Sequence, residues 1–149
     1  MEYTIGQVAK QLGLSTPTLR YYEDEGLLSG VRRTEGGRRV YTESDLEALR
    51  VIECLKHTGL SIKEISDFVK MVSRGDESIP DRLELFRERR DQVKTQQAEL
   101  AHMQEILVFK CWYYEKALEL GSEAAVRALP NSKVPKRLRE VRNYLGSFD

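Results

Sequence analysis

The chain has 149 residues, and its 24 basic and 24 acidic residues leave no formal net charge at pH 7. This length predicts one compact domain with an appendage, and the absence of a run of about 18 apolar residues excludes a membrane-spanning helix. Two distant cysteines argue against a disulfide framework, and the N-terminus has no signal-peptide pattern, so we expect a cytoplasmic protein.

The first 28 residues predict two short helices joined by a tight turn, which is a helix-turn-helix unit. Apolar residues recur at helical spacing from Ile5 to Leu12, and Gly13 ends this helix. Ser15 or Thr16 can cap the second helix, whose N-terminal part normally enters the major groove. Neighbouring residues on a helix face different ways, so one tyrosine of the pair is open to a core role, Tyr21 more than Tyr22. The residues expected to read or anchor DNA are Ser15, Thr16, Thr18, Arg20, Tyr21 and Tyr22.

The following stretch lacks helical periodicity and predicts a two-stranded hairpin, because Gly36-Gly37 separates two short extended runs. Four arginines crowd this ribbon, and arginine binds phosphate through its planar fork, so a DNA backbone is the expected partner. In the alternative interpretation, the ribbon is a solvated loop whose arginines pair with Glu35, Glu43 and Asp45. The residues expected to grip the backbone are Arg38, Arg39 and Tyr41.

Two more helices are predicted behind this hairpin. One spans residues 42–58 with Thr42 or Ser44 as its cap, and the next begins with a capping box formed by Ser61 and Glu64. Residues 73–80 have turn-forming character and little to bury. The expected divisions are a DNA-binding domain at 1–75, a hinge at 76–80, a dimerisation helix at 81–121 and a basic tail at 122–149.

A long helix is predicted to begin near Asp81. Its apolar residues fall at seven-residue steps among charged and Gln-rich neighbours, which is typical of a two-stranded coiled coil. The alternative is one amphipathic helix packed on its own domain. However, a stripe of about 40 residues at ~1.5 Å per residue is longer than the face of a small domain. A two-fold homodimer is therefore expected, with an inverted-repeat DNA site. The residues expected in the dimer are Phe86, Val93, Leu100, Leu107 and Tyr114.

These motifs, in this order and spacing, resemble the MerR family of transcription regulators. The resemblance covers about the first 75 residues closely and the following helix by architecture. Its motifs are Tyr3-Thr4-Ile5-Gly6-Gln7-Val8-Ala9, the run Leu19 to Leu28, Arg39-x-Tyr41, Asp45-Leu46 and the run Thr58 to Ile65. It implies a mainly α fold with an N-terminal winged helix-turn-helix, a small β-hairpin wing, a long antiparallel coiled-coil helix and a short helical tail. The family's wing arginine corresponds to Arg39; many relatives carry an aromatic or aliphatic residue where this chain has Arg38.

The same resemblance implies a mechanism and partners. The dimer would bind double-stranded promoter DNA and, when induced, distort the spacer so that RNA polymerase finds realigned promoter elements. Bending such a site costs a few kcal/mol, and one protein conformation can select the bent form. No enzyme motif is present: the sequence has no Gly-rich phosphate loop, paired-His zinc motif or nucleophile elbow.

Cys54 is the candidate sensor. Its surroundings resemble the aldehyde- and electrophile-responsive, NmlR- and AdhR-like branch of the family, in which a lone cysteine at this place is modified. Neighbouring Lys56 and His57 can favour the reactive thiolate; the alternative is a small buried filler. No metal or other cofactor is expected, because Cys111, itself expected in the core, has no second thiol nearby.

The aromatic residues from Phe109 to Tyr114 can pack the dimer end or line a ligand pocket. Two other functions therefore stay open: a regulator of a small organic ligand bound near Trp112 to Tyr114, and a DNA-bending protein that needs no inducer. The tail is expected to hold a helix near 122–129, a break from Pro130 to Pro135 and a basic segment, either folded back on the dimer or mobile.

Overall fold

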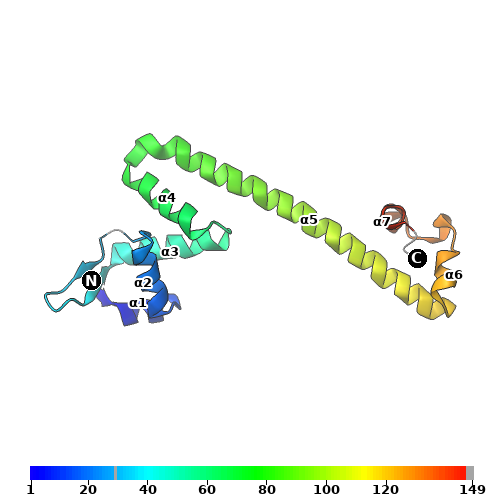
Figure 1. Cartoon of the computed structure of the whole chain (residues 1–149), viewed down its shortest axis with the longest axis horizontal. Coiled ribbons are helices and arrows are strands. Elements are labelled where there is room, and N and C mark those ends of the chain that lie inside the picture. The colour runs from blue at the N-terminus through cyan, green and yellow to red at the C-terminus, as the bar shows by residue number, and fades with distance from the viewer. Residues whose placement is uncertain (29, 147–149) are drawn as a thin grey trace. The chain divides into compact units, whose positions relative to one another are not determined.

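The computed structural model describes residues 1–28 and 30–146, and the fold is mainly helical, as the sequence predicts. The chain divides into two compact units, residues 1–90 and residues from 91 onward. The first unit contains β1 (Glu2–Thr4), α1 (Ile5–Leu12), α2 (Thr16–Asp24), β2 (Arg32–Arg33), β3 (Arg39–Thr42), α3 (Glu43–His57), α4 (Ile62–Ser73), a 3-10 turn (Gly75–Ser78) and the beginning of α5 (Ile79–Leu120) (Figure 1). Within the described ranges no helix is long and apolar enough to cross a membrane.

Local capping defines the helix-turn-helix. Gly13 closes α1 in the left-handed region at φ 67°, which a residue with a Cβ adopts at a cost, and its N–H donates to the carbonyl of Ala9. Ser15, not Thr16, caps α2: its hydroxyl accepts from the Thr18 N–H at 3.1 Å. The predicted unit of α1, turn and α2 is confirmed.

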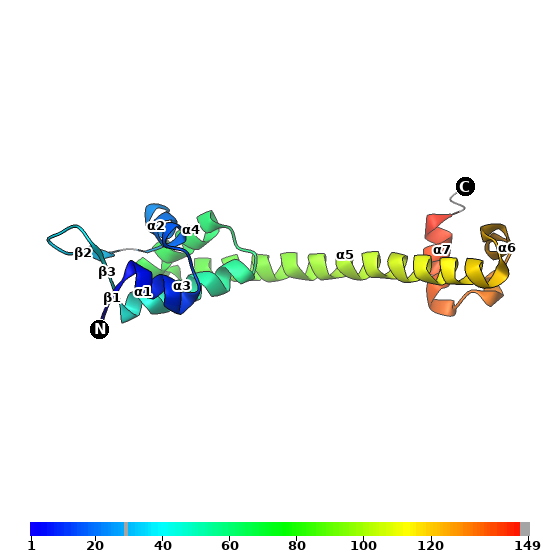
Figure 2. The ribbon, with the colours of Figure 1, turned by 90° about the horizontal axis from the view of Figure 1, so that it is seen from below.

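The wing belongs to a three-stranded antiparallel sheet in the order β1-β3-β2. The sequence predicted only the β2–β3 hairpin; residues before α1 add β1, with Tyr3 opposite Tyr41. The turn between β2 and β3 is closed by Gly37 at φ 75°, and it extends beyond the helices of this unit (Figure 2). One face of β3 is covered, because Tyr41 on that face belongs to the buried core.

Thr42 and Ser61 cap the next two helices through capping boxes, with Asp45 and Glu64 as their partners. Helix α4 is also bonded to the end of α2, since the Ser66 hydroxyl donates to the Glu25 carbonyl at 2.9 Å. One core joins the helices and the sheet. Its largest fully buried side chains are Val8, Leu19, Tyr22, Leu27, Tyr41, Leu46, Leu49, Ile52 and Ile65.

The beginning of α5 packs on this core. Leu85 lies against it, and the rings of Phe68 and Phe86 are 5.3 Å apart at a steep angle. Arg89 donates to the Thr58 carbonyl at 2.5 Å, and a Cβ at Gly59, which has φ 85°, would collide with the Arg89 side chain. The first unit therefore reaches residue 90, further than the division expected at residue 75.

The segment expected to be a hinge is more ordered than its composition suggests. Gly75–Ser78 form a 3-10 turn, and α5 begins at Ile79, two residues before Asp81. Ser78 is fully buried, and its hydroxyl donates to the carbonyls of Met71 and Gly75. Ser78 is the one buried residue of residues 73–80, and it can be buried because its hydroxyl bonds back to the preceding helix; the other residues of this loop are exposed, as expected.

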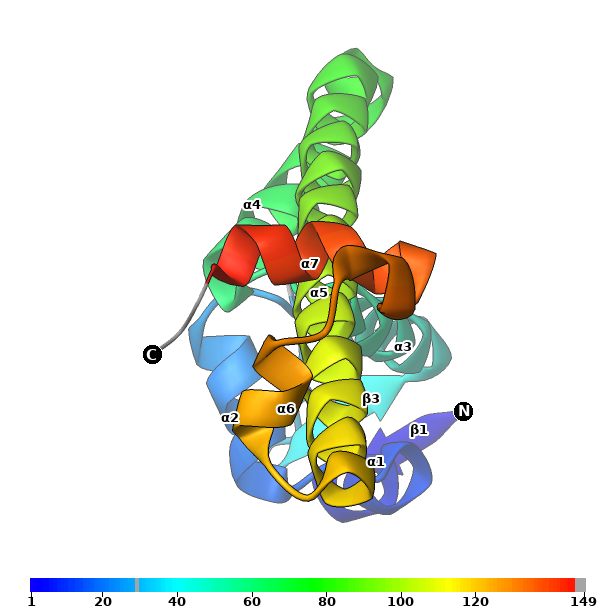
Figure 3. The same cartoon turned by 90° about the vertical axis from the view of Figure 1, so that its right-hand side faces the viewer.

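The second unit contains the rest of α5, α6 (Glu123–Arg127), two 3-10 turns (Asn131–Lys133 and Lys136–Leu138) and α7 (Arg139–Leu145). Its tail folds back on the end of α5 of the same chain, with α7 lying across that helix (Figure 3). Phe109 is buried against Val134, Leu138 and Val141, and Trp112 and Tyr113 pack beside them. These aromatic residues thus pack against the chain's own tail.

The Ser61–Glu64 capping box predicts a pH dependence. Hydrogen bonds from the Ser61 hydroxyl and backbone lower the pKa of Glu64 below its ordinary value of 4.5. The unfolded chain keeps the ordinary pKa, so the stabilisation is complete above it and is lost as the pH falls through the lowered folded value. Glu64→Gln should lower the free energy of unfolding at neutral pH by less than about 1 kcal/mol, and the deficit should vanish on acidification in urea titrations. Exposed Glu47→Gln is the matched control; a deficit that grows toward acid would contradict the assignment.

Candidate nucleic-acid interface

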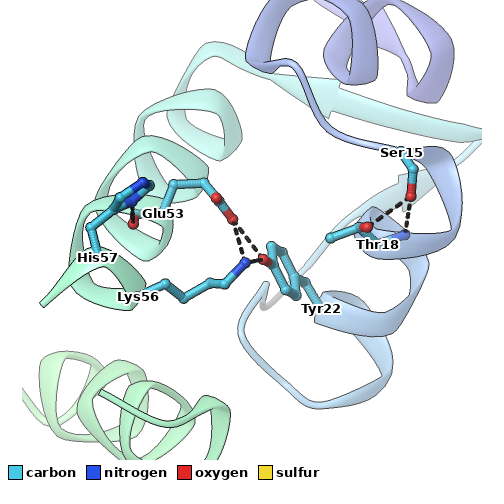
Figure 4. A network of polar contacts seen from close by, with 6 residues as sticks. All are labelled: Ser15, Thr18, Tyr22, Glu53, Lys56 and His57. Atoms are coloured by element: carbon cyan, nitrogen blue, oxygen red, sulfur yellow. Dashed lines mark hydrogen bonds and ion pairs between the residues drawn. The ribbon is translucent and has the colours of Figure 1, made fainter. Parts of the chain in front are cut away.

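The surface of α2 presents a small polar group at its beginning and two long side chains further on. The hydroxyls of Ser15 and Thr18 lie 2.7 Å apart, so both are held in fixed positions (Figure 4). Arg20 is exposed, and Tyr21 is 47% exposed. The described part of the chain gives Arg20 no ion-pair partner, which leaves its guanidinium able to meet an outside anion.

The wing arginines differ in how their charges are balanced. Arg39 donates to Glu23 of α2 at 2.5 Å, with both side chains about one-fifth exposed. This hydrogen bond raises the pKa of Arg39. Arg33 also reaches Glu23, at 3.4 Å, and Arg32 pairs with Glu2 at 2.8 Å. The pairing carboxylates are thus Glu23 and Glu2, not those of the solvated-loop alternative, and Glu23 fastens the wing to α2.

Arg38 is the exception among these four. Its backbone N–H donates to the Thr34 hydroxyl in the turn, its side chain is exposed, and no ion pair of the described residues includes it. Arg38 and Arg20 are therefore the two predicted contact residues whose charges no carboxylate of the described chain neutralises.

Tyr22 is a core residue, which corrects the expectation that Tyr21 was the better candidate. It follows Leu19 by three positions and shares its inward face, and it is 1% exposed while Tyr21 faces outward. Its hydroxyl donates to Glu53 of α3 at 2.6 Å and accepts from the ammonium of Lys56 (Figure 4). Burial is the main cause that raises the pKa of Tyr22, followed by the bond to Glu53.

Tyr41 does not grip an outside backbone in this structure. It is fully buried, and its hydroxyl has no hydrogen-bond partner among the described residues. The expectation treated the wing as a ribbon with two open faces, whereas Tyr41 lies on the covered face of the central strand. Burial raises its pKa.

Cys54 is exposed, so the interpretation as a buried filler is wrong. It stands between Glu53 and Lys56, which both bond Tyr22, and the Lys56 ammonium is directed to that pair. His57 holds the Glu53 carbonyl through Nδ1 at 2.7 Å. Cys111, expected in the core, is also exposed. No group of three or more potential metal ligands occurs in the described ranges.

The bonds that three residues of this site make were missed from the sequence. Glu23, Glu53 and Lys56 look like ordinary solvated charges in their helices, and their partners lie 16 to 34 positions away. The only local signal was the spacing of Leu19 and Tyr22, which places the tyrosine inward.

The rest of α5 keeps an exposed apolar stripe. Leu100 and Leu107 are each 64% exposed and Tyr114 is 52% exposed, while Val93 is half-buried. Phe86 differs from the others because it also packs on Phe68 of its own chain.

Comparisons with known proteins agree with this geometry. The model of the MerR HTH family regulatory protein matches residues 3–72, and the model of the MerR DNA-binding region matches residues 46–108. An uncharacterized HTH-type transcriptional regulator of Haemophilus influenzae is 44% identical over 126 residues, which are 85% of this chain and 93% of that protein. The regulator AdhR of Bacillus subtilis is 37% identical over 89 residues, 60% of this chain and 64% of AdhR.

Among solved structures, HiNmlR, a MerR family regulator lacking the sensor domain and bound to promoter DNA, matches with a TM-score of 0.66 and 43% identity. The match covers 84% of this chain and 99% of HiNmlR. The chain therefore belongs to the MerR family of helix-turn-helix DNA-binding transcription regulators, in its NmlR- and AdhR-like branch.

Proposed function

We propose that this regulator binds an inverted-repeat promoter site as a homodimer and activates transcription by distorting the spacer DNA when a reactive aldehyde or electrophile modifies Cys54. RNA polymerase would respond indirectly, through the altered DNA. The observation that carries the proposal is the position of an exposed Cys54 beside Glu53 and Lys56, the two residues that bond Tyr22 of α2.

The chemistry at Cys54 needs no further reagent. The thiol adds to the aldehyde carbonyl carbon, a sulfur–carbon bond forms, and the thiol proton ends on the carbonyl oxygen. The new group adds bulk and a hydroxyl to the exposed surface of α3. A change there can reach DNA only if α3 is coupled to α2, and the Tyr22 bonds supply such a coupling.

For DNA binding, the hydroxyls of Ser15, Thr16 and Thr18 would position the beginning of α2 in the major groove, with Tyr21 beside them. Arg20 and Arg38 would bind phosphate, since their charges are not balanced within the described chain. Arg39 would position the wing through Glu23 more than it would bind phosphate itself.

Dimerisation would cover the exposed stripe of α5. Leucines that are about two-thirds exposed over several helical turns are typical of a coiled-coil seam. The antiparallel arrangement is inferred from the family. A two-fold axis would place the two DNA-binding units on the two halves of an inverted repeat.

A second candidate is a regulator of a small organic ligand bound near Trp112 to Tyr114, and a cavity beside these residues favours it. A third candidate is a DNA-bending protein without an inducer. It would share every feature of the DNA-binding unit and would differ only in that no inducer changes its activity.

The proposal is tested by in vitro transcription from the promoter of the protein's own gene, with formaldehyde or methylglyoxal added. The aldehyde should activate wild type and Cys111→Ser equally, because both retain Cys54, and should leave Cys54→Ser at its basal level. Activation that survives in Cys54→Ser would overturn the sensor assignment. No activation in any protein would favour the ligand or the inducer-free alternative.

The charge assignment predicts different salt dependences for two adjacent arginines. Arg38→Ala and Arg20→Ala should each lower the slope of log affinity against log salt by about one, because each would remove a phosphate contact. Arg39→Ala should weaken binding while changing the slope little, because the Arg39 guanidinium is already engaged by Glu23 of α2 and holds the wing rather than a phosphate. Exposed Arg87→Ala on α5 is the control, and the DNA is the inverted repeat that the protein selects from a random library. A slope lowered by Arg39→Ala but not by Arg38→Ala would reverse the assignment.

The coupling through Tyr22 predicts a variant with a weakened response. Tyr22→Phe keeps the buried ring and removes the hydroxyl, so aldehyde activation should fall about 3- to 10-fold, as expected for one lost hydrogen bond in the coupling. The measurement is the same transcription assay, at protein concentrations that saturate the DNA. Tyr3→Phe is the matched control, because the Tyr3 hydroxyl donates at 2.8 Å to Glu43 at the other end of α3. Equal responses from both variants would exclude Tyr22 as the coupling residue.

A further inference from the structure

A cavity of about 300 Å³ lies between the end of α5 and the tail that folds back on it. All its lining residues lie between 109 and 146, beyond the residues that the two family models match. The size is at the lower end of the range for sites that bind small molecules. It depends on neither the DNA-contacting residues nor Cys54.

One wall of this cavity is aromatic. Phe109, Trp112 and Tyr113 pack with ring centroids about 6 Å apart, at 5.9 and 6.1 Å from Phe109. Tyr114 also lines the cavity. Flat apolar surfaces of this kind hold a planar ring well, because stacked or tilted aromatic pairs gain more than their buried area alone.

The charges around the cavity are predominantly positive. Lys110, Arg127 and Arg142 line it, against the single carboxylate of Glu123. That carboxylate is already satisfied: it accepts from the Tyr113 hydroxyl at 3.2 Å and pairs with Arg127 at 3.7 Å. A cationic ligand would therefore find no available carboxylate in this wall.

The contacts of Arg142 indicate that the ligand is an anion. Its two terminal nitrogens donate to the Asn131 side-chain oxygen at 3.2 Å and the Arg127 carbonyl at 3.0 Å, both of which are neutral acceptors. The partners hold the half-buried guanidinium in place at the cavity without cancelling its charge. Arginine in such a position binds a carboxylate strongly through charge-assisted hydrogen bonds.

We propose that this cavity binds a small aromatic carboxylate, with its ring against Phe109, Trp112 and Tyr113 and its carboxylate against Arg142. The site gives the regulator a second input, distinct from covalent modification of Cys54. Because Tyr114 also belongs to the exposed stripe of α5, a ligand here lies beside the proposed dimer seam.

The test uses Trp112, the chain's one tryptophan, whose indole N–H gives a single signal in nitrogen–proton NMR spectra of the full-length protein. Titration with benzoate or 2-naphthoate should shift this signal to saturation at concentrations up to about 10 mM. The uncharged 2-naphthamide should bind at least about tenfold more weakly than 2-naphthoate, because it cannot form the charge-assisted bond. This comparison needs no variant, so it holds even if a substitution disturbs folding.

Arg142→Gln should weaken 2-naphthoate binding by about tenfold or more and bring it near the level of the amide. Exposed Lys133→Gln in the same tail is the matched control and should leave binding unchanged. Cys54→Ser should also bind normally, which separates this proposal from the sensor assignment. Equal affinity for carboxylate and amide, unchanged binding by Arg142→Gln, or no saturable shift with either carboxylate would each overturn the proposal.

Discussion

The arrangement of the first unit, residues 1–90, depends on the contacts of the buried Tyr22 side chain. Its ring fills the core between α2 and the helices behind it, and its hydroxyl bonds Glu53 and Lys56 of α3. A hydroxyl buried in this way is costly to leave unpaired, so the position of α2 and the position of this segment of α3 constrain each other. Cys54 lies within the same segment. The helix expected to enter DNA and the candidate sensor are therefore joined by one polar cluster.

Ion pairs within the chain reduce the positive charge of the rest of the candidate DNA interface. The chain has no net charge, and its wing arginines are mostly paired: Glu23 holds Arg33 and Arg39, and Glu2 holds Arg32. The pairs with Glu23 fix the wing to α2, the pair with Glu2 joins β2 to β1, and all three reduce the wing's attraction for arbitrary polyanions. Two carboxylates for three arginines lower the charge of these pairs without cancelling it, and Arg20 and Arg38, which pair with no carboxylate of the described chain, would contribute most to the salt-dependent part of binding.

The sequence predicted the parts of this structure that local chemistry determines. The cap at Ser61, the end of α1 at Gly13 and the long α5 follow from neighbouring residues and are confirmed. The two open choices of cap, Ser15 or Thr16 and Thr42 or Ser44, are decided for Ser15 and Thr42. What it missed depends on contacts between distant positions. β1 is recognised only through its pairing with β3, and Tyr41 is buried by core residues from several other elements. The Tyr22 bonds span more than 30 positions. The tail's packing on Phe109 likewise joins residues too far apart for any local pattern.

Energy transfer between dyes on either side of the spacer measures whether modification of Cys54 changes the shape of bound DNA. The complex is measured with the selected inverted repeat at saturating protein, before and after formaldehyde, with the adduct verified by protein mass. Energy transfer should change in the wild-type complex at constant occupancy and stay constant with Cys54→Ser. An equal change with Cys54→Ser, or no change when wild-type Cys54 is fully modified, would contradict the proposed role of Cys54.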